Sequence, residues 1–257
     1  MENDQPISNK NTRSKPIMNV GVIPARLEST RFPRKILFLI NDRPMVVHVY
    51  EQALKATKLD KVIVAVDSEI TATVLNDYNI DSIMTSPSHQ SGTDRISEAT
   101  SNIAADIIVN LQADEPLIEP ELIDQLVECF VDETTKMATL VSTLISADDL
   151  NDPNTVKVKV DNNDEALGFY RQIDEHGADY LRHIGIYAYR RETLKYFTKL
   201  KQTANEKKFR LEQLRALDNG VPIKVIKCDY QYHGIDTPED LKQFNYFTED
   251  INLRKDQ

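Results

Sequence analysis

The stretch that decides the fold is DIIVNLQADEPLI, residues 106–118. Its first part, DIIVNL, is largely apolar and lacks the alternation of a half-exposed strand, which is typical of a strand covered on both faces of a parallel sheet. The polar residues Gln112, Asp114 and Glu115 follow directly. Because ligands collect at the carboxyl ends of parallel strands, this stretch predicts a covered sheet with a polar site at its edge.

The segments around this stretch repeat the alternation of strand and helix. We expect strands at 19–23, 61–66, 81–84 and 106–111, and helices at 44–57, 68–78, 91–104 and 119–132. Pro44 begins the first of these helices and Ser68 caps the second. This order predicts an α/β fold with a mainly parallel, Rossmann-like sheet, right-handed crossovers and flanking helices.

The second half of the chain is less regular. Segments 137–145, 155–161 and 184–190 read as longer alternating strands, which suit either a mixed sheet or an arm packed on a partner subunit. We expect one amphipathic helix over 206–220, EKKFRLEQLRALDNG, ended by Gly220, and a last helix at the C-terminus after a further strand.

Composition limits the classes of protein. The 257 residues, 40% of them hydrophobic, suffice for one domain with an elaboration. A net charge of -10 opposes broad binding to nucleic acid or to an anionic membrane surface. Cys129 and Cys228 lie far apart, which suits reduced thiols in the cytoplasm and disfavours a zinc site. No apolar run is long enough for membrane insertion, and residues 1–17 form a polar tail without a signal sequence.

A basic loop follows the first strand on this acidic chain. The stretch VIPARLESTRFPRKIL, residues 22–37, holds Arg26, Arg31, Arg34 and Lys35. It has neither the Gly-x-Gly-x-x-Gly nor the Gly-Lys-Ser/Thr pattern that cradles phosphates with backbone amides, so side chains must supply the charge. Arg26 at the end of the strand and Lys35 across the loop can meet a polyphosphate. The alternative is an ordinary solvated surface loop.

Asp114 is a candidate ligand for Mg²⁺ at the same sheet edge. Magnesium takes one or two protein carboxylates and completes its shell with water and substrate phosphates. The alternative role is that of a helix-capping carboxylate, which suits Glu115 or Glu119 better because they lie nearer the helix PELIDQL.

Six separated motifs resemble the CMP-Kdo synthetases, the 3-deoxy-manno-octulosonate cytidylyltransferases. The motifs are IPARLESTRFPRKIL, HQSGTDRISEA, VNLQADEPLI, LRHIGIYAYR, LEQLRAL and GIDTPEDL, in register from about residue 19 to about residue 244. The resemblance implies a nucleotidyltransferase fold and a reaction in which CTP and an acidic 3-deoxy sugar give a CMP-sugar and pyrophosphate. It also implies Mg²⁺, a homodimer, a cytoplasmic enzyme and a place in lipopolysaccharide biosynthesis.

The resemblance also implies a division of the chain and a set of site residues. The nucleotide-binding part would span 18–135, the sugar-binding and dimerisation part 136–235, and the C-terminal helix 238–253. Catalytic roles fall to Arg26, Lys35, Asp114 and Asp236, of which the two aspartates hold the metal. The nucleotide-binding positions are Ala25, Arg26, Ser29, Lys35 and Gln112, and the sugar-binding positions are Arg95, Gln112, Arg171, His183, Tyr187, Glu212 and Gln213.

Several of these residues have a second, structural interpretation. His183 and Tyr187 suit a sheet histidine and a core aromatic residue. Glu212 can pair with Arg215 or Lys208 on its own helix, and Asp236 can cap the last helix.

The chain departs from the family at three places. Family members commonly have glycine where this chain has Arg34 and Ala113, and glycine tolerates backbone angles that arginine does not. The segment after Phe169, YRQIDEHGADYLRH, is shorter than in the family, which bears most on Arg171. A reshaped sugar pocket would suit an amino analogue of Kdo. The alternatives are a sialic-acid-type cytidylyltransferase and a nucleotide-binding homologue without turnover.

Overall fold

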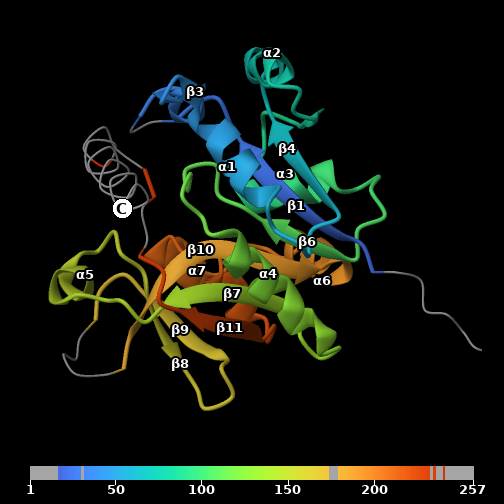
Figure 1. Ribbon diagram of the computed structural model, residues 1–257. Helices are drawn as coiled ribbons and strands as arrows, with labels where there is room; N and C mark the ends of the chain where they lie inside the picture. The colour runs from blue at the N-terminus through green and yellow to red at the C-terminus, as the bar shows by residue number, and fades with distance from the viewer. Residues whose placement is uncertain (1–16, 30–31, 174–178, 232–233, 236–239, 241–257) are drawn as a thin grey trace, which may run out of the picture.

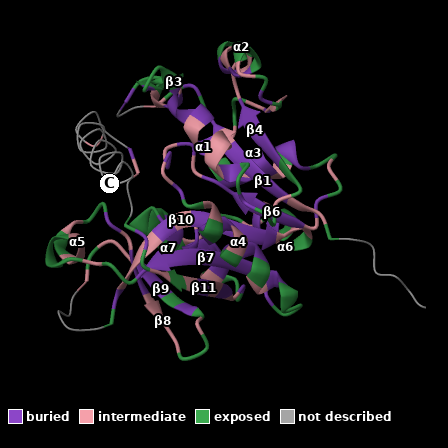
Figure 2. Cartoon of the chain, in the orientation of Figure 1, coloured by how far each residue is buried: buried purple, intermediate pink, exposed green. Residues whose placement is uncertain are grey.

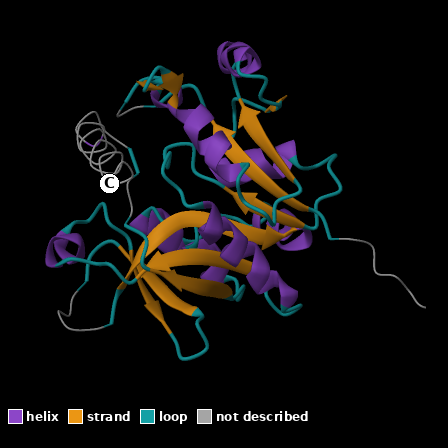
Figure 3. Cartoon of the chain, in the orientation of Figure 1, coloured by secondary structure: helices purple, strands orange, loops and turns teal. Residues whose placement is uncertain are grey.

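The computed structural model describes residues 17–29, 32–173, 179–231, 234–235 and 240. In this part of the chain, a nine-stranded mixed sheet has the strand order β11-β7-β10-β6-β1-β4-β5, with β8 and β9 attached beside β10. Helices cover both faces of this sheet (Figures 1 and 3). The expected α/β class with flanking helices is therefore confirmed.

The first half of the chain forms the parallel part of the sheet. β1 pairs in parallel with β4 on one side and β6 on the other, and β4 pairs in parallel with β5. The strands are β1 (Asn19–Ala25), β4 (Lys61–Val66), β5 (Ser82–Met84) and β6 (Ile107–Asn110). The helices are α1 (Met45–Ala53), α2 (Glu69–Asp77), α3 (Gly92–Ala99) and α4 (Pro120–Glu128). Ser68 caps α2 as expected, with its hydroxyl accepting from the Ile70 amide.

Short elements complete the first half. They are the 3-10 helices η1 (Lys35–Leu37) and η2 (Cys129–Val131) and the hairpin of β2 (Leu39–Ile40) and β3 (Arg43–Pro44). The helix expected over 91–104 ends at Ala99, and that expected over 119–132 finishes as the 3-10 helix η2.

The second half of the chain extends the same sheet in mixed directions. β10 runs antiparallel to β6 and β7, and β11 runs parallel to β7. The strands are β7 (Met137–Ser142), β8 (Lys157–Val160), β9 (Ala166–Tyr170), β10 (Leu181–Arg190) and β11 (Ile223–Cys228). The mixed-sheet interpretation is confirmed. β7 is buried at every position because helices pack over both of its faces, so the alternation expected there is wrong.

The single helix expected over 206–220 is also wrong. The chain forms α7 (Ala204–Phe209) and α8 (Leu214–Asp218) instead. Arg210 lies between them in the left-handed region, with φ 54° and ψ 47°. A helix cannot continue through such a residue, and the break turns residues 211–213 toward the sheet. The other helices of this half are α5 (Ala147–Asn151) and α6 (Arg191–Phe197).

Two apolar cores lie on opposite faces of the sheet. The strands β1, β6 and β7 are drawn mainly as buried (Figure 2). α1 and α4 pack on one face, and α3, α6 and α8 on the other. Ile107, Ile108 and Val109 of β6 are at most 1% exposed, and burial of each such side chain contributes about 1.5–3 kcal/mol. The central strand predicted from DIIVNL is thus covered on both faces.

Some expectations concern the ends of the chain and its cysteines. The C-terminal helix was expected at 238–253, and only Asp240 of this range lies within the described residues. Of the expected N-terminal tail, only residue 17 is described. Cys129 and Cys228 are free thiols. None of the described helices has the length and apolar character needed to span a bilayer.

Candidate active site

A cavity lies at the carboxyl ends of β1 and β6, which are neighbours in the sheet. Its volume is about 350 Å³, and we call it the basic cavity. The residues that line it come from the loops after these strands, from η1 and from the start of α3: Pro24, Arg26, Ser29, Lys35, Ile36, His89, Gln90, Ser91, Gly92, Arg95, Gln112, Ala113 and Asp114. The structure therefore brings together the predicted nucleotide residues Arg26, Ser29, Lys35 and Gln112, and it buries Ala25 directly beside them in β1.

Lys35 and Asp114 form an ion pair across the basic cavity. Lys35 Nζ donates to Asp114 Oδ2 at 2.6 Å, and the two side chains are 12% and 23% exposed. The pair is reachable from solvent, so its energy is modest and each partner can exchange it for a stronger ligand. Asp114 thus lies where a cation can replace Lys35, and Lys35 lies where a phosphate can replace Asp114.

Arg95 lies in the wall of the basic cavity and is almost fully buried. Its guanidinium donates to Thr85 Oγ1 at 2.6 Å and to Asp67 Oδ2 at 3.1 Å. Asp67 Oδ1 in turn accepts from the Leu27 amide at 2.9 Å, directly after Arg26 in the chain. Arg95, predicted for the sugar, therefore lines the basic cavity and ties the basic loop to α3.

Arg34 has a left-handed backbone conformation, which fits the glycine that the resembled family commonly has at this position. Its φ is 54° and its ψ 30°, in the left-handed region, immediately before η1. The turn is closed by the Lys35 amide donating to Phe32 O at 3.1 Å and the Leu37 amide donating to Arg34 O at 2.9 Å. Arg34 is exposed and is strained relative to glycine, while its turn directs Lys35 into the cavity.

A second cavity of about 180 Å³ shares Gly92 and Gln112 with the basic cavity. We call it the aromatic cavity. Its lining also includes Thr93, Asn110, Met137, Tyr187, Tyr189, Phe197, Glu212 and Gln213. Four predicted sugar residues, Gln112, Tyr187, Glu212 and Gln213, are thus brought together beside the basic cavity. The break at Arg210 is what places Glu212 and Gln213 there.

An irregularity in β10 shapes the boundary between the two cavities. The register of β10 with β7 shifts between Ile184 and Tyr187. The carbonyls freed by this bulge are satisfied by side chains: Gln112 Nε2 donates to Gly185 O at 2.7 Å, and Thr139 Oγ1 donates to Ile186 O at 2.8 Å. Bulges of this kind re-aim side chains next to active sites, and here Gln112 is fixed between the cavities.

His183 lies behind Tyr187 on β10. Its ring contacts those of Phe169 and Tyr187, with centroids 5.1 and 5.3 Å apart, and its Nε2 lies 3.1 Å from Thr139 Oγ1. Burial lowers the pKa of His183 from the usual 6.5 to about 3, because the charged form is disfavoured there. His183 is therefore a neutral packing and hydrogen-bonding group, and it is not among the residues that line the aromatic cavity.

Glu212 is the carboxylate of the aromatic cavity. Its Oε2 accepts from Thr93 Oγ1 at 2.6 Å, and Arg215 Nη2 lies 3.5 Å from its Oε1. Burial raises the pKa of Glu212 despite the hydrogen bond from Thr93. The stronger partner of Arg215 is Glu206, at 2.8 Å from Nε. The pairing of Glu212 with Arg215 is thus real but secondary, and Glu212 remains available to the cavity.

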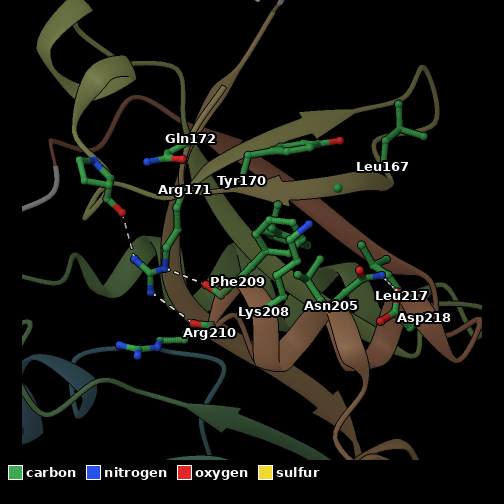
Figure 4. A pocket seen from close by; sticks show the side chains of 14 residues that line it. Leu167, Tyr170, Arg171, Gln172, Asn205, Lys208, Phe209, Arg210, Leu217 and Asp218 are labelled. Atoms are coloured by element: carbon green, nitrogen blue, oxygen red, sulfur yellow. Dashed lines mark hydrogen bonds between the residues drawn. The ribbon is translucent and has the colours of Figure 1, made fainter. Parts of the chain in front are cut away.

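Arg171 lies apart from both cavities. It lines a third cavity of about 640 Å³ formed by β9, α7 and α8 (Figure 4). Its guanidinium donates to three carbonyls, those of Pro153 at 3.1 Å, Phe209 at 3.0 Å and Arg210 at 3.3 Å. The structure thus places Arg171 as a clasp on the end of α7, and it does not bring this residue to the predicted sugar residues.

Asp236 lies outside the described residues. The residue before it, Ile235, donates its amide to Asp114 O at 2.9 Å, so the described chain is next to Asp114 at the residue that precedes Asp236.

Three residues of the site were not predicted from the sequence: Asn110, Thr93 and Asp67. Only Asn110 carried a signal, as a polar residue ending an apolar strand.

Known proteins resemble this chain along most of its length. A family model described as cytidylyltransferase matches residues 20–226. The 3-deoxy-manno-octulosonate cytidylyltransferase of a Nitratiruptor species is 44% identical over 234 residues, covering 87% of this chain and 97% of the relative. That of Trichlorobacter lovleyi is 42% identical over 241 residues, covering 87% and 96%. A solved structure of CMP:2-keto-3-deoxy-manno-octonic acid synthetase complexed with CTP has a TM-score of 0.86 at 37% identity, covering 91% of this chain and 99% of that one.

Proposed function

The chain belongs to the 3-deoxy-manno-octulosonate cytidylyltransferase family, and from this premise we propose that it transfers CMP from CTP to the anomeric hydroxyl of Kdo or a close analogue. Pyrophosphate is the second product. The observation that carries the proposal is the contact between two unlike cavities. Gly92 and Gln112 line both the basic cavity, which suits a triphosphate, and the aromatic cavity, which suits a hydroxylated sugar.

The reaction follows from this arrangement. The anomeric oxygen forms a bond to the α-phosphorus, the bond from that phosphorus to the bridging oxygen breaks, and its electrons leave with pyrophosphate, while the hydroxyl proton passes to solvent. Catalysis of such a displacement depends on positioning and charge neutralisation. Arg26 and Lys35 are the cations that offset charge on the phosphates. Gln112, held by Gly185, lies at the boundary where the two substrates meet.

We further propose Mg²⁺ as the cofactor, held by Asp114 and Asp236. In the part of the chain that the structure describes, no three His, Cys, Asp or Glu side chains gather as a metal cluster. Magnesium needs only one or two protein carboxylates when phosphates complete its shell, and Asp114 lines the cavity assigned to the phosphates. When bound, the ion supplies charge neutralisation and lowers the pKa of the sugar hydroxyl. The ion pair with Lys35 keeps the Asp114 carboxylate turned into the cavity until then.

The finer assignments rest on the family resemblance. We infer a homodimer, a cytoplasmic location where CTP is available, and a place in lipopolysaccharide biosynthesis. The sugar-side roles of Tyr187, Glu212 and Gln213 are supported by their meeting in one cavity. For Arg171 the observed bonds support the role of clasping the end of α7 rather than contact with the sugar carboxylate.

Pyrophosphate release with CTP, Mg²⁺ and a panel of acidic sugars tests the proposal. We expect turnover with Kdo, loss of turnover on chelation of the metal and its return on adding Mg²⁺. The panel should contain an amino analogue of Kdo and a sialic acid. Turnover with the sialic acid alone would contradict the substrate assignment. Binding of CTP without pyrophosphate release from any sugar would contradict catalysis itself.

A further inference from the structure

Asn110 ends β6 in a position that favours apolar residues. The rest of the strand is Ile-Ile-Val, and Asn110 itself is only 4% exposed. Asparagine is depleted in strands, because its short polar side chain competes for backbone hydrogen bonds. The Asn110 side chain nevertheless lines the aromatic cavity.

The side-chain oxygen of Asn110 has no hydrogen-bond partner among the described residues, although it is buried. Buried polar groups in native proteins are nearly always paired, and an exception calls for an explanation such as a missing ligand. The neighbouring basic cavity shows the usual situation, since Lys35 and Arg95 are both paired there. The orphaned oxygen of Asn110 is therefore a specific feature of the aromatic cavity.

A second orphaned group lies next to Asn110. Tyr187 of β10 is its direct cross-strand partner, so the two side chains are neighbours on one face of the sheet. The Tyr187 hydroxyl is buried too and lacks an aligned hydrogen bond, although Thr139 is nearby. Two adjacent strands thus present a carbonyl oxygen and a hydroxyl to one small cavity, whose carboxylate, Glu212, is held by Thr93.

We propose that Asn110 is a specificity-determining residue whose side-chain oxygen accepts a hydrogen bond from a hydroxyl group of the sugar, while the Tyr187 hydroxyl bonds a second oxygen of the same sugar. The inference rests on the proposed function and adds to it the protein group, the Asn110 side-chain oxygen, that recognises one hydroxyl of the sugar. A site built to bond a hydroxyl rejects analogues that lack it, because the buried partner is then left unpaired. In the free enzyme that same unpaired state lowers stability.

The test combines Asn110→Leu with Kdo analogues that each lack one hydroxyl other than the anomeric one. With the wild-type enzyme, one analogue should lose about tenfold to a hundredfold in kcat/KM, as expected for a lost hydrogen bond to a buried group. In Asn110→Leu, kcat/KM for Kdo should fall by a similar factor. The analogue that was poorly used by the wild type should then have the same kcat/KM as Kdo. The KM for CTP should stay within about twofold of the wild-type value.

Thermal unfolding separates this role from a structural one. Because Leu removes an unpaired buried oxygen, Asn110→Leu should unfold at the same temperature as the wild type or higher. Thr71→Val is the matched control: the Thr71 hydroxyl is also buried and unpaired, but it lies on α2, outside both cavities. It should leave the KM for both substrates unchanged. Asn110→Thr is the second variant should the leucine variant not fold.

Two results would overturn the inference about Asn110. One is that every deoxy analogue loses the same factor in Asn110→Leu as in the wild type. The other is a lower unfolding temperature of Asn110→Leu with an unchanged KM for Kdo, which would make Asn110 a structural residue. In both cases the wild-type enzyme still uses Kdo and the proposed function stands. Absence of wild-type turnover with every octulosonate would instead remove the proposed function, and the inference with it.

Discussion

The basic and aromatic cavities share a wall but satisfy their polar groups in opposite ways. In the basic cavity two of the less exposed cations form ion pairs, Lys35 with Asp114 and Arg95 with Asp67, whereas Arg26 is exposed. In the aromatic cavity the groups are largely neutral, and Asn110 and Tyr187 carry buried atoms without aligned partners. The basic cavity thus holds Lys35 and Arg95 in ion pairs, and the aromatic cavity leaves two neutral atoms unpaired.

The difference follows from the cost of burying each kind of group. An unpaired buried charge costs far more than an unpaired buried carbonyl or hydroxyl, so cations in a cavity wall need a partner before a ligand arrives, whereas an exposed cation such as Arg26 is solvated by water. A neutral site can tolerate one or two unpaired atoms at about 1–3 kcal/mol each. The cavities should therefore respond differently when a partner is removed.

The largest effect is expected at Asp114. Asp114→Ala should lower kcat by about a thousandfold or more, since a metal ion supplies several kcal/mol of transition-state stabilisation. The fold should be retained, because the side chain lies at a partly exposed cavity wall. Pyrophosphate release and far-ultraviolet circular dichroism measure the two outcomes. The isosteric Asp114→Asn should show a similar loss, and near-normal turnover of either variant would contradict the proposed role of Asp114 as a metal ligand.

A smaller effect is expected at Lys35, whose ion pair with Asp114 must break before a cation can bind that carboxylate. Lys35→Met should lower kcat/KM for CTP by about tenfold to a hundredfold, the usual worth of one charge-assisted hydrogen bond. Without CTP the same variant should bind Mn²⁺ more tightly than the wild type, since the Lys35 ammonium no longer competes for Asp114. Titration of Mn²⁺ by electron paramagnetic resonance measures this.

Lys195→Met is the control for Lys35, because Lys195 forms an exposed ion pair with Glu192 on α6. It should change neither quantity. Weaker binding of Mn²⁺ to Lys35→Met than to the wild type would contradict the exchange of partners at Asp114.

The two cavities also differ in how far the sequence predicts them. The basic cavity is built from the loops that follow two neighbouring parallel strands, so the periodicity of residues 106–118 and the charge of residues 22–37 suffice to bring Arg26, Lys35 and Asp114 together. The aromatic cavity depends on the break at Arg210 and the bulge before Tyr187. Arg210 is neither glycine nor proline, so helical periodicity predicted one unbroken helix. The bulge does contain a glycine, Gly185, but the sequence was interpreted there as one regular strand. The place of Arg171 could not be predicted either, since it donates to the carbonyls of Phe209 and Arg210, which lie together at the end of α7 only because the helix breaks there.

The pH dependence of stability tests the neutral character around the aromatic cavity. The unfolded chain protonates His183 near pH 6.5, whereas the folded protein does so only near pH 3. The stability from this group is therefore fully present above about pH 6.5 and is lost as the pH falls, by roughly 2 kcal/mol between pH 7 and pH 5. His183→Gln should flatten the curve of unfolding free energy against pH in that interval. Equal slopes in the wild type and the variant would show that His183 is not held neutral by burial.

The smallest effect is expected at Arg34, where the loop of the basic cavity carries strain instead of an unpaired group. Arg34→Gly removes the penalty of a left-handed backbone but adds entropy to the unfolded chain, so the net gain should be roughly 0.5–1 kcal/mol. For a chain of this size, that raises the unfolding temperature by about 1–4 °C. Arg34→Ala is the matched control, since it removes the same charge but keeps the Cβ atom, and it should give no gain. If both variants lose affinity for CTP equally, the Arg34 guanidinium belongs to the phosphate site; if neither does, the arginine only occupies a position where the backbone favours glycine.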